Sequence, residues 1–543
     1  MKKYVLFTAC LLLGGAAYSQ KKGGADRPKI VVGMVIDQMR WDYLYRYYDR
    51  YTEGGFKRLM GKGFNCQNAM INYLPSYTAP GHACIYTGSV PSIHGIVAND
   101  FIDNFTCNSV YCVMDNSVHI INNGDTGLSS MSPANLLTTT ITDELRLATN
   151  FKSRVYGISA KDRGSIIPAG HLASGAYWFD ENTGNFVSST YYKNTRPAWL
   201  SGFNKRKVAD SFMKYDWQLL YPDATYTQSI TDANKYEGNF HGEATAAFPH
   251  KFSGLTGKDK YHTFLSTPGG NDIVLMMANA CIDAEALGQG SSTDFLAVSL
   301  SSTDYIGHQF GPNAVETEDA YLRLDRELAT FLEGLDRRFG KNNYLLFLTA
   351  DHGAAYNPQY LLDEGVPAGF LKNIKGDINT MLKSKFGKDS IVFAALNYQL
   401  YLNEPYLAKN NIDREKVKDA VVAYVNTKPE IAFVADMENM DRTAIPEPIK
   451  TMIVNGYYRG RSGVLQMIPN PGWFSGYGTT GTTHGTWHPY DTHIPLLWYG
   501  WNIPKGETHA VINMTDISAT LAALLHIQMP NGCVGKPITD LVK

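Results

Sequence analysis

Residues 31–39 read VVGMVIDQM, and this stretch decides the fold because an unbroken apolar run ends directly in the acidic Asp37. A short run that is apolar on both faces is typical of a strand buried in a parallel sheet, so we predict a strand over Ile30–Ile36. Further runs of this kind give the other predicted strands: Arg154–Ser159, Phe295–Leu300, Tyr344–Leu348 and Ile494–Tyr499.

Helical patterns lie between some of these strands. The clearest is Val315–Phe339, where leucine and phenylalanine recur at helical spacing until the chain reaches Gly340. A second pattern covers Met514–Ile527 and has Asp516 in its first turn, where a carboxylate suits a helix. The alternation of strands and helices predicts an α/β sandwich on a mostly parallel sheet.

Two segments interrupt this alternation. Residues 171–260 are rich in tyrosine, tryptophan, glycine and asparagine, and we predict a loop-rich insertion there. Residues 370–470 carry strand and helix signals of their own, which predicts a small α/β insertion. We therefore expect one large domain over residues 20–543 that carries two inserted subdomains.

The N-terminus predicts export. Lys2 and Lys3 precede an apolar run and then small residues up to Ser19, so residues 1–19 are expected to be a signal peptide. Cys10 lies inside the apolar run rather than at its end, which disfavours a lipid anchor. No other stretch approaches the roughly 20 apolar residues of a membrane span, so we expect a periplasmic or secreted protein with no stable membrane anchor.

The overall charge argues against a nucleic-acid-binding protein. The 49 Lys and Arg against 51 Asp and Glu give a net charge of −2, which becomes −4 once Lys2 and Lys3 leave with the signal peptide. No basic patch stands out along the sequence, so nucleic acid is not an expected partner.

Cysteines suggest disulfides in the exported protein. An even number remains after residue 19, and an oxidising compartment favours their pairing. Cys107 and Cys112 are close enough in sequence to pair across a short loop, while the other pairings stay open. The six cysteines are Cys66, Cys84, Cys107, Cys112, Cys281 and Cys533.

Acidic residues and histidines follow three of the predicted strands. Asp37 comes directly after the first strand, and Asp304 follows the third, with His308 four residues further on. Asp351 and His352 end the fourth strand. Because sites in open parallel sheets form at the carboxyl ends of the strands, we expect these side chains to share one edge of the sheet.

Each of these residues also has a simpler explanation. An Asp after a strand is most often a helix cap, and a D-x-x-x-H pair is often a surface ion pair. The segment TTHGTWHPYDTHIP (482–495) adds His484, His488 and His493, and so many clusters at strand ends together favour a metal site. Mixed carboxylate and imidazole ligands suit zinc, whereas harder ions prefer oxygen ligands alone.

With these residues in view, the sequence resembles the alkaline phosphatase superfamily, on the branch of type I phosphodiesterases and nucleotide pyrophosphatases. More narrowly, it resembles the phosphate-irrepressible alkaline phosphatases of the PafA type. The motifs that carry the resemblance follow in the family's order: VIDQMRWDYL, PSYTAPGHACIYTG, HGIVAND, SAKDRG, SSTDYIGH, TADHG and GTTHG. The resemblance implies an alkaline-phosphatase-like three-layer α/β sandwich with a mostly parallel central sheet and inserted smaller subdomains.

The resemblance also implies two bound zinc ions per chain, with other divalent metals as alternatives. One ion would be held by Asp37, Asp351, His352 and the hydroxyl of Thr78. The other would be held by Asp304, His308 and His484. His488 and His493 fall outside the implied ligand set.

The window INYLPSYTAPGHACIYTGSVPSIHGIVAND (71–100) contains the implied nucleophile and one phosphate ligand. By resemblance, Thr78 attacks phosphorus and forms a phospho-threonine, and Asn99 holds a phosphate oxygen with help from the Ala79 backbone N–H. Lys161 and Arg163 in SAKDRG match the cationic pair that favours phosphate monoesters. The histidines of the window, His82 and His94, are expected to be structural, as are Ser76, Thr87 and Ser89.

These features predict a secreted two-metal alkaline phosphatase that acts as a monomer on small phosphate esters. The nearest alternative is a phosphodiesterase or nucleotide pyrophosphatase with the same two-metal site, against which Lys161 and Arg163 count. A sulfatase would need C/S-x-P-x-R, but TAPGH has Thr and no arginine. A non-catalytic, metal-binding surface protein is the alternative from another class.

Overall fold

The structure is a computed structural model that describes residues 27–121, 129–476 and 479–542. The predicted signal peptide lies outside these residues. None of the described helices is both long and apolar enough to cross a membrane.

The strand predicted at the start of the chain, β1 (Ile30–Ile36), lies inside a 12-stranded sheet. Its neighbours are β10 (Asp294–Leu300) on one side and β11 (Tyr344–Thr349) on the other, and β7 (Val155–Ser159) follows beyond β10. All three pairings are parallel. The prediction of a mostly parallel central sheet is therefore confirmed.

One edge of the sheet differs from the prediction. The run Ile494–Tyr499 is not one parallel strand, because it is divided into β18 (His493–Ile494) and β19 (Leu496–Gly500). Pro495 separates the two, since proline has no N–H to donate to a sheet. Strand β19 pairs antiparallel with β11 and with β2 (Phe64–Met70), which the sequence analysis did not identify.

On the opposite side of the sheet, beyond β7, lie two strands from the predicted loop-rich insertion. Residues 171–260 begin with β8 (Gly175–Asp180), which pairs parallel with β7, and β9 (Asn185–Ser189), which pairs antiparallel with β8. The prediction of loops is wrong for these two strands, although irregular structure prevails after them. Both are buried because they extend the central sheet.

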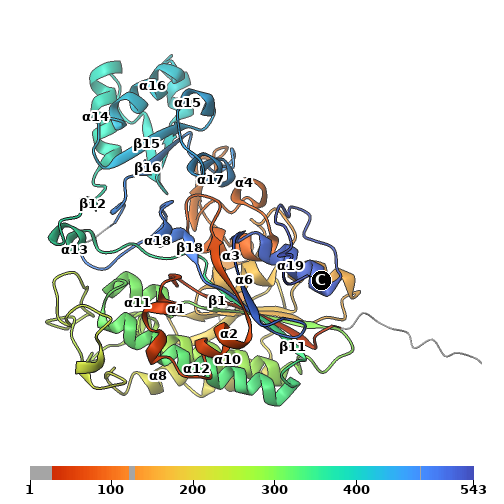
Figure 1. Cartoon of the computed structure of the whole chain (residues 1–543). Helices are drawn as coiled ribbons and strands as arrows, with labels where there is room; N and C mark the ends of the chain where they lie inside the picture. Colours follow the sequence, from red (N-terminus) through yellow and green to blue (C-terminus); the bar gives the residue numbers. More distant parts are fainter. Residues whose placement is uncertain (1–26, 122–128, 477–478, 543) are drawn as a thin grey trace, which may run out of the picture.

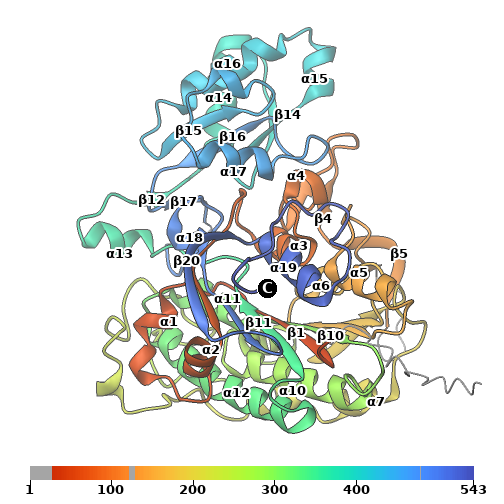
Figure 2. The same ribbon diagram turned by 45° about the vertical axis from the view of Figure 1, so that its right-hand side comes forward.

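Helices cover both faces of the sheet, as Figures 1 and 2 show. The long helix α12 (Val315–Phe339) has its predicted bounds and packs with α10 (Gly269–Ala284) on one face. On the other face lie α3 (Thr78–Thr87), α6 (Asp162–Ala169) and α19 (Asp516–Leu525). These three layers confirm the predicted sandwich.

The region predicted as a small α/β insertion contains a four-stranded sheet of its own, drawn at the top of Figure 1. Its strands, in spatial order, are β13 (Val392–Leu396), β14 (Gln399–Leu402), β16 (Leu465–Pro469) and β15 (Ile431–Asp436). Helices α14 (Ile374–Phe386) and α16 (Arg414–Val425) pack against this sheet and bury a separate apolar cluster.

The remaining elements are short and connect these layers. The helices are α1 (Tyr43–Arg46), α2 (Phe56–Lys62), α4 (Pro91–His94), α5 (Ile141–Ala148), α7 (Ala198–Lys205), α8 (Val208–Phe212), α9 (Gly257–Leu265), α11 (Ser302–Phe310), α13 (Pro358–Asp363), α15 (Glu404–Lys409), α17 (Ile449–Gly456) and α18 (Pro489–Thr492). The strands are β3 (Asp100–Ile102), β4 (Ser109–Tyr111), β5 (Met114–Ile121), β6 (Ser129–Met131), β12 (Gly369–Phe370), β17 (Trp473–Phe474) and β20 (Gly506–Asn513).

The cysteines do not form the predicted disulfides. All six in the described residues are free thiols. Cys107 is exposed in the turn between β3 and β4, whereas Cys112 is buried in an apolar cluster with Phe101 and Val113. The short sequence separation therefore does not bring the two into one environment.

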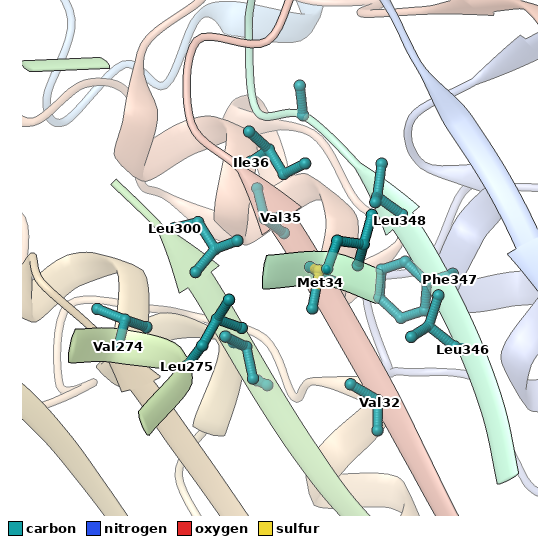
Figure 3. Packing of buried hydrophobic residues seen from close by; sticks show 14 of the residues in the cluster. Val32, Met34, Val35, Ile36, Val274, Leu275, Leu300, Leu346, Phe347 and Leu348 are labelled. Carbon is teal, nitrogen blue, oxygen red and sulfur yellow. The ribbon is translucent and has the colours of Figure 1, made fainter. Parts of the chain in front are cut away.

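Buried side chains of β1 and its neighbours, among them Met34, Leu300 and Phe347, pack closely in the core of the sheet (Figure 3). Gly33 stands in register between Ala297 of β10 and Phe347 of β11. A Cβ atom at this position would lie 2.5 Å from the hydroxyl of Tyr86 and 2.6 Å from Cζ of Phe347. The missing side chain is what lets these two aromatic rings pack over β1.

We expect Gly33→Ala to destabilise the protein by about 1–3 kcal/mol, because overpacked cores shift rotamers and backbone. The midpoint of urea unfolding measures the effect. Gly61→Ala is the matched control, since nothing lies within 4 Å of a Cβ built at Gly61 and alanine favours the helix α2 that contains it. Equal unfolding midpoints for the two variants would contradict this account of the core.

Candidate active site and metal centre

The carboxyl ends of adjacent strands bring the predicted site residues together. Asp37 follows β1, Asp304 lies in the first turn of α11 just after β10, and Asp351 follows β11. Lys161 follows β7. All four side chains are buried, so the site lies inside the edge of the sheet rather than on its surface.

Asp304 forms one group with two histidines. Its Oδ1 is 3.1 Å from His308 Nε2 and 3.8 Å from His484 Nε2. His308 is one turn beyond Asp304 on α11, whereas His484 comes from the distant loop before α18. One ligand atom from each lies within 4.8 Å of the others, so the three residues could hold a metal ion.

A second group lies beside the first. Asp37, Asp304 and His352 also offer ligand atoms within 4.8 Å of one another, and Asp37 Oδ1 is 3.4 Å from His352 Nε2. Asp351 joins this group, with its Oδ2 at 3.6 Å from the same nitrogen. Asp304 therefore belongs to both groups, although the resemblance assigned it to one ion.

The histidines are oriented by backbone carbonyls. Nδ1 of His308 donates to Thr482 O at 2.8 Å, Nδ1 of His352 to Gly353 O at 3.0 Å, and Nδ1 of His484 to Ser76 O at 2.8 Å. Because a carbonyl can only accept, Nδ1 of each ring carries a proton, and Nε2 is the atom that faces the carboxylates. This is the arrangement by which proteins orient metal-binding imidazoles.

Burial keeps two of these imidazoles neutral. Desolvation lowers the pKa of His352, and it lowers the pKa of His484 well below its usual range with help from His352 and His308. The carboxylates are crowded: burial and the neighbouring Asp37 raise the pKa of Asp351 well above its usual range. Asp37 Oδ1 and Asp351 Oδ2 are buried without any hydrogen-bond partner. Neutral imidazoles beside unpartnered carboxylate oxygens fit divalent cations.

Lys161 lies between the two groups rather than apart from them. Its ammonium is 2.7 Å from Asp37 Oδ2 and also contacts Asp304 Oδ2. Burial would lower the pKa of Lys161, but Asp304 and Asp37 outweigh it and raise this pKa. The structure thus places Lys161 on the carboxylates, whereas the resemblance predicted a contact with phosphate.

Thr78 is the first residue of α3 and is buried beside the carboxylates. Its hydroxyl lies 3.4 Å from His352 Nε2. Gly81, one turn further along α3, permits this approach, since a Cβ there would lie 2.6 Å from the Asp351 carbonyl oxygen. His82 fixes the same turn, because its Nδ1 donates to Thr78 O at 2.9 Å.

Asn99 lies next to the start of α3. Its Oδ1 accepts from the Ala79 N–H at 2.9 Å. The Ala79 N–H, expected to bind phosphate, is therefore engaged by Asn99. This bond turns the amide nitrogen of Asn99 away from Ala79, which leaves that nitrogen as the donor.

Arg163 is positioned by the β3–β4 hairpin. Its Nη1 is 3.1 Å from the hydroxyl of Tyr111, and that hydroxyl donates to Asp162 Oδ1 at 2.5 Å. Burial would lower the pKa of Arg163, but Tyr111 and Asp162 outweigh it and keep the guanidinium charged. The buried Nε of Arg163 has no hydrogen-bond partner.

Sequence reasoning missed some residues that contact the site. Gln38 donates to Asp304 Oδ1 at 2.5 Å, and its backbone N–H donates to Asp351 Oδ1 at 3.2 Å. Its place directly after Asp37 was the available signal. Tyr111 carried no signal, since only the fold brings it to Arg163. His82, predicted to be structural, also lies 3.4 Å from Asp351 Oδ2.

The two histidines excluded from the ligand set are indeed elsewhere. His488 Nε2 lies 3.3 Å from Pro469 O. His493 stacks on Trp41, with ring centroids 4.5 Å apart, and its Nε2 lies 3.0 Å from Gln67 O. Of the three histidines in the segment 482–495, His484 alone joins the carboxylates.

The parallel α/β sheet, with buried carboxylates and imidazoles at the carboxyl ends of its strands, agrees with the family that the sequence comparison identifies. The chain belongs to the type I phosphodiesterase / nucleotide pyrophosphatase family, whose model matches residues 31–491. The chain is 46% identical to alkaline phosphatase PafA of Elizabethkingia meningoseptica, over 100% of this chain and 99% of that protein. It is 48% identical to alkaline phosphatase PhoV of Synechococcus elongatus, with 100% of both chains covered.

A further relative and the solved structures extend the comparison. A protein named calcium-transporting ATPase, from Myroides odoratus, is 48% identical over 100% of this chain and 99% of its own length. The crystal structure of wild-type PafA matches with a TM-score of 0.93, covering 96% of this chain and 100% of the other. A PafA variant with the same TM-score has a threonine, an asparagine, a lysine and an arginine substituted, at the same spacing as Thr78, Asn99, Lys161 and Arg163.

The crowding of the carboxylates predicts that removing the charge of Asp351 has opposite effects on stability in the absence and in the presence of Zn²⁺. A carboxyl whose pKa is raised by folding contributes stability below its unfolded pKa of about 4, and this contribution is lost as pH rises through the folded pKa. At neutral pH, Asp351→Asn should therefore raise the Tm of the metal-free protein. The same change should reduce the increase in Tm that added Zn²⁺ produces.

Differential scanning calorimetry with and without Zn²⁺ measures both effects. Asp491→Asn is the control, because Asp491 is equally buried and burial raises its pKa to about 7, yet it lies outside both groups. That variant should keep the full response to Zn²⁺. A full response in Asp351→Asn as well would contradict the role of Asp351.

Proposed function

We propose that this protein is an alkaline phosphatase that hydrolyses phosphate monoesters through a covalent phospho-threonine at Thr78. The observation that carries the proposal is the position of the Thr78 hydroxyl, buried at the start of α3 and 3.4 Å from His352 Nε2 beside the carboxylates. The names of PafA and PhoV, relatives along the whole chain, support the same activity.

Two zinc ions are proposed to complete the site. Asp37, Asp351, His352 and the Thr78 hydroxyl would hold one, and Asp304, His308 and His484 the other. Zinc bound by these residues would supply Lewis-acid chemistry, which lowers the pKa of a hydroxyl and stabilises negative charge on oxygen. Each of the three imidazoles already holds its Nδ1 on a backbone carbonyl and turns Nε2 toward the carboxylates, which is the orientation that this binding needs.

Thr78 is proposed to act as the nucleophile. Its Oγ1 forms a bond to phosphorus while the bond between phosphorus and the alcohol oxygen breaks, and solvent takes the hydroxyl proton and protonates the leaving alcohol. Water then attacks the phospho-threonine, which releases phosphate and restores Thr78. The N-terminus of the ten-residue helix α3 favours the negative charge that gathers there.

Asn99, Arg163 and Lys161 are proposed to hold the remaining phosphate oxygens. The amide nitrogen of Asn99 is set by the bond between its Oδ1 and Ala79, and the Arg163 guanidinium is set by Tyr111. Lys161 would turn to phosphate once divalent cations neutralise Asp37 and Asp304. A monoester dianion offers more charge to these cations than a diester does, which favours monoesterase over phosphodiesterase activity.

Export is part of the proposal. The predicted signal peptide over residues 1–19 supports a periplasmic or secreted enzyme. Free thiols remain compatible with either place, because four of the six cysteines are buried. Small phosphate esters that reach the periplasm or the medium would be its substrates.

Thr78→Ala should lower kcat/KM on p-nitrophenyl phosphate by about a thousandfold or more, because removing a nucleophile abolishes the covalent route. Thr78→Ser keeps a hydroxyl and is the matched control, expected to retain most of the activity that Thr78→Ala loses. Zinc content, measured by mass spectrometry, should stay near that of the wild type in both. Turnover by Thr78→Ala within tenfold of the wild type would refute the mechanism.

Tyr111→Phe should lower kcat/KM for a monoester by about tenfold, the value of one hydrogen bond to a charged group, because Arg163 loses its anchor. The rate on the corresponding methyl diester should change much less, so the monoester-to-diester ratio falls. Tyr192→Phe is the control, since the buried Tyr192 hydroxyl has no hydrogen-bond partner. An unchanged ratio in Tyr111→Phe would show that the Tyr111 hydroxyl does not set Arg163.

A further inference from the structure

A second cluster of carboxylates lies away from the zinc ligands, where the segment after residue 228 packs on the start of α12 (Figure 1). Asp232, Glu237 and Glu316 each offer one carboxylate oxygen, and these oxygens lie within 4.8 Å of one another. Glu237 is only 4% exposed and Glu316 is completely buried. Unlike the zinc ligands, these three residues offer oxygen atoms only.

The cluster has buried oxygens that accept no hydrogen bond. Glu237 Oε2 and Glu316 Oε2 are both in this state. The zinc-ligand region shows the same feature at Asp37 Oδ1 and Asp351 Oδ2. A buried carboxylate oxygen without a donor is costly, so each of these oxygens calls for a cation or a proton.

Charge within the cluster is not balanced by the protein. His250 is the nearby cation: its Nδ1 is 3.1 Å from Glu243 Oε2 and its Nε2 is 3.1 Å from Glu316 Oε1. Burial would lower the pKa of His250, but Glu243 and Glu316 raise it to about 9. This one positive charge faces two carboxylates already, and no Lys or Arg within the described ranges pairs with Asp232 or Glu237.

Glu237 is the residue most affected by this imbalance. Burial and the adjacent Glu316 raise the pKa of Glu237 to about 9. Among the residues that the structure describes, Asn234 is the only side-chain donor to Glu237: its Nδ2 binds Oε1 at 2.6 Å and leaves Oε2 without a partner. A divalent cation would stabilise all three carboxylates in their charged form.

We propose that Asp232, Glu237 and Glu316 bind one Ca²⁺ ion. Ca²⁺ takes oxygen ligands at about 2.3–2.6 Å in flexible geometry, so oxygens up to about 4.8 Å apart can share it, whereas Mg²⁺ requires shorter bonds and strict octahedral geometry. The absence of imidazole from the three ligands disfavours zinc. The site is distinct from the catalytic one and does not depend on the proposed reaction.

The bound ion would hold a segment that supports the zinc ligands. On one side of Glu237, Tyr236 O accepts from the Gly481 N–H at 2.6 Å, three residues before His484. On the other side, Gly238 exchanges hydrogen bonds with Gln309, the residue after His308: Gly238 N–H donates to Gln309 O at 2.8 Å and Gln309 Nε2 to Gly238 O at 2.6 Å. Ca²⁺ would therefore stabilise the backing of both histidines.

Calcium binding to the zinc-saturated protein tests the proposal. Equilibrium dialysis with radioactive Ca²⁺ should find one Ca²⁺ per wild-type chain, and calorimetry should show a higher Tm in 1 mM Ca²⁺. Glu237→Gln should weaken binding at least about a hundredfold and lose the increase in Tm. Glu144→Gln is the matched control, because Glu144 is a buried glutamate with a raised pKa outside the cluster, and it should bind Ca²⁺ like the wild type.

Other results would overturn the proposal. If the wild type binds no Ca²⁺ and Glu237→Gln raises the Tm, the two glutamates share a proton instead. If Mg²⁺ binds and Ca²⁺ does not, the assignment to Ca²⁺ is wrong. Should Glu237→Gln fail to fold, Tb³⁺ luminescence in the wild type decides, because Trp217 lies 5.3 Å from His250 and would sensitise an ion in the cluster. Luminescence that Ca²⁺ does not quench would count against the site.

Discussion

Repulsion among buried carboxylates at one edge of the sheet is the constraint on which the rest of the structure depends. Asp37, Asp304 and Asp351 stand at the ends of adjacent strands, and their side chains are buried. Parallel pairing brings the ends of neighbouring strands together, so the fold itself creates this concentration of charge. The surrounding residues compensate for this repulsion: Lys161 binds two of the carboxylates, Gln38 donates to two, and His308 forms an ion pair with Asp304, which outweighs burial and raises the pKa of His308.

Other buried carboxylates in the chain are stabilised by hydrogen bonds from the protein. The carboxylate of Asp325 is also buried, but it accepts from the Thr52 and Phe56 backbone N–H groups at 2.6 and 2.7 Å and therefore needs no cation. Among the groups that could hold a metal ion, unpartnered carboxylate oxygens occur at Asp37 in the group at the sheet edge and at Glu237 and Glu316 in the second cluster. Where the protein supplies donors to a buried carboxylate, as at Asp325, the carboxylate is stabilised without a cation.

Much of the fold was predictable from local pattern, because a buried parallel strand has a nearly continuous apolar sequence. Strand β1 and helix α12 have the predicted bounds. The direction of β19 was not predictable, since an apolar run looks the same in either direction, and β8 and β9 were hidden among polar and aromatic residues. In the site, residue types at strand ends and family motifs predicted most of the carboxylates and histidines that the fold brings together, the first being Asp37 and the last His484. The position of Lys161 on carboxylates, the engagement of Ala79 by Asn99, and Tyr111 depend on three-dimensional contacts that no spacing encodes.

The hairpin of β3 and β4 links the groups proposed to grip phosphate. Asn99 lies directly before β3, and its carbonyl accepts from the N–H of Cys112, just after β4, at 2.8 Å. Tyr111, the last residue of β4, lies next to this bond, where it pairs with Asp100 and anchors Arg163. The separation of amide and guanidinium is thus fixed by a single pair of strands outside the central sheet. A change in this hairpin would therefore alter the distance between the amide and the guanidinium, and with it the proposed preference among esters. The buried carboxylates at the ends of the central strands would stay unchanged.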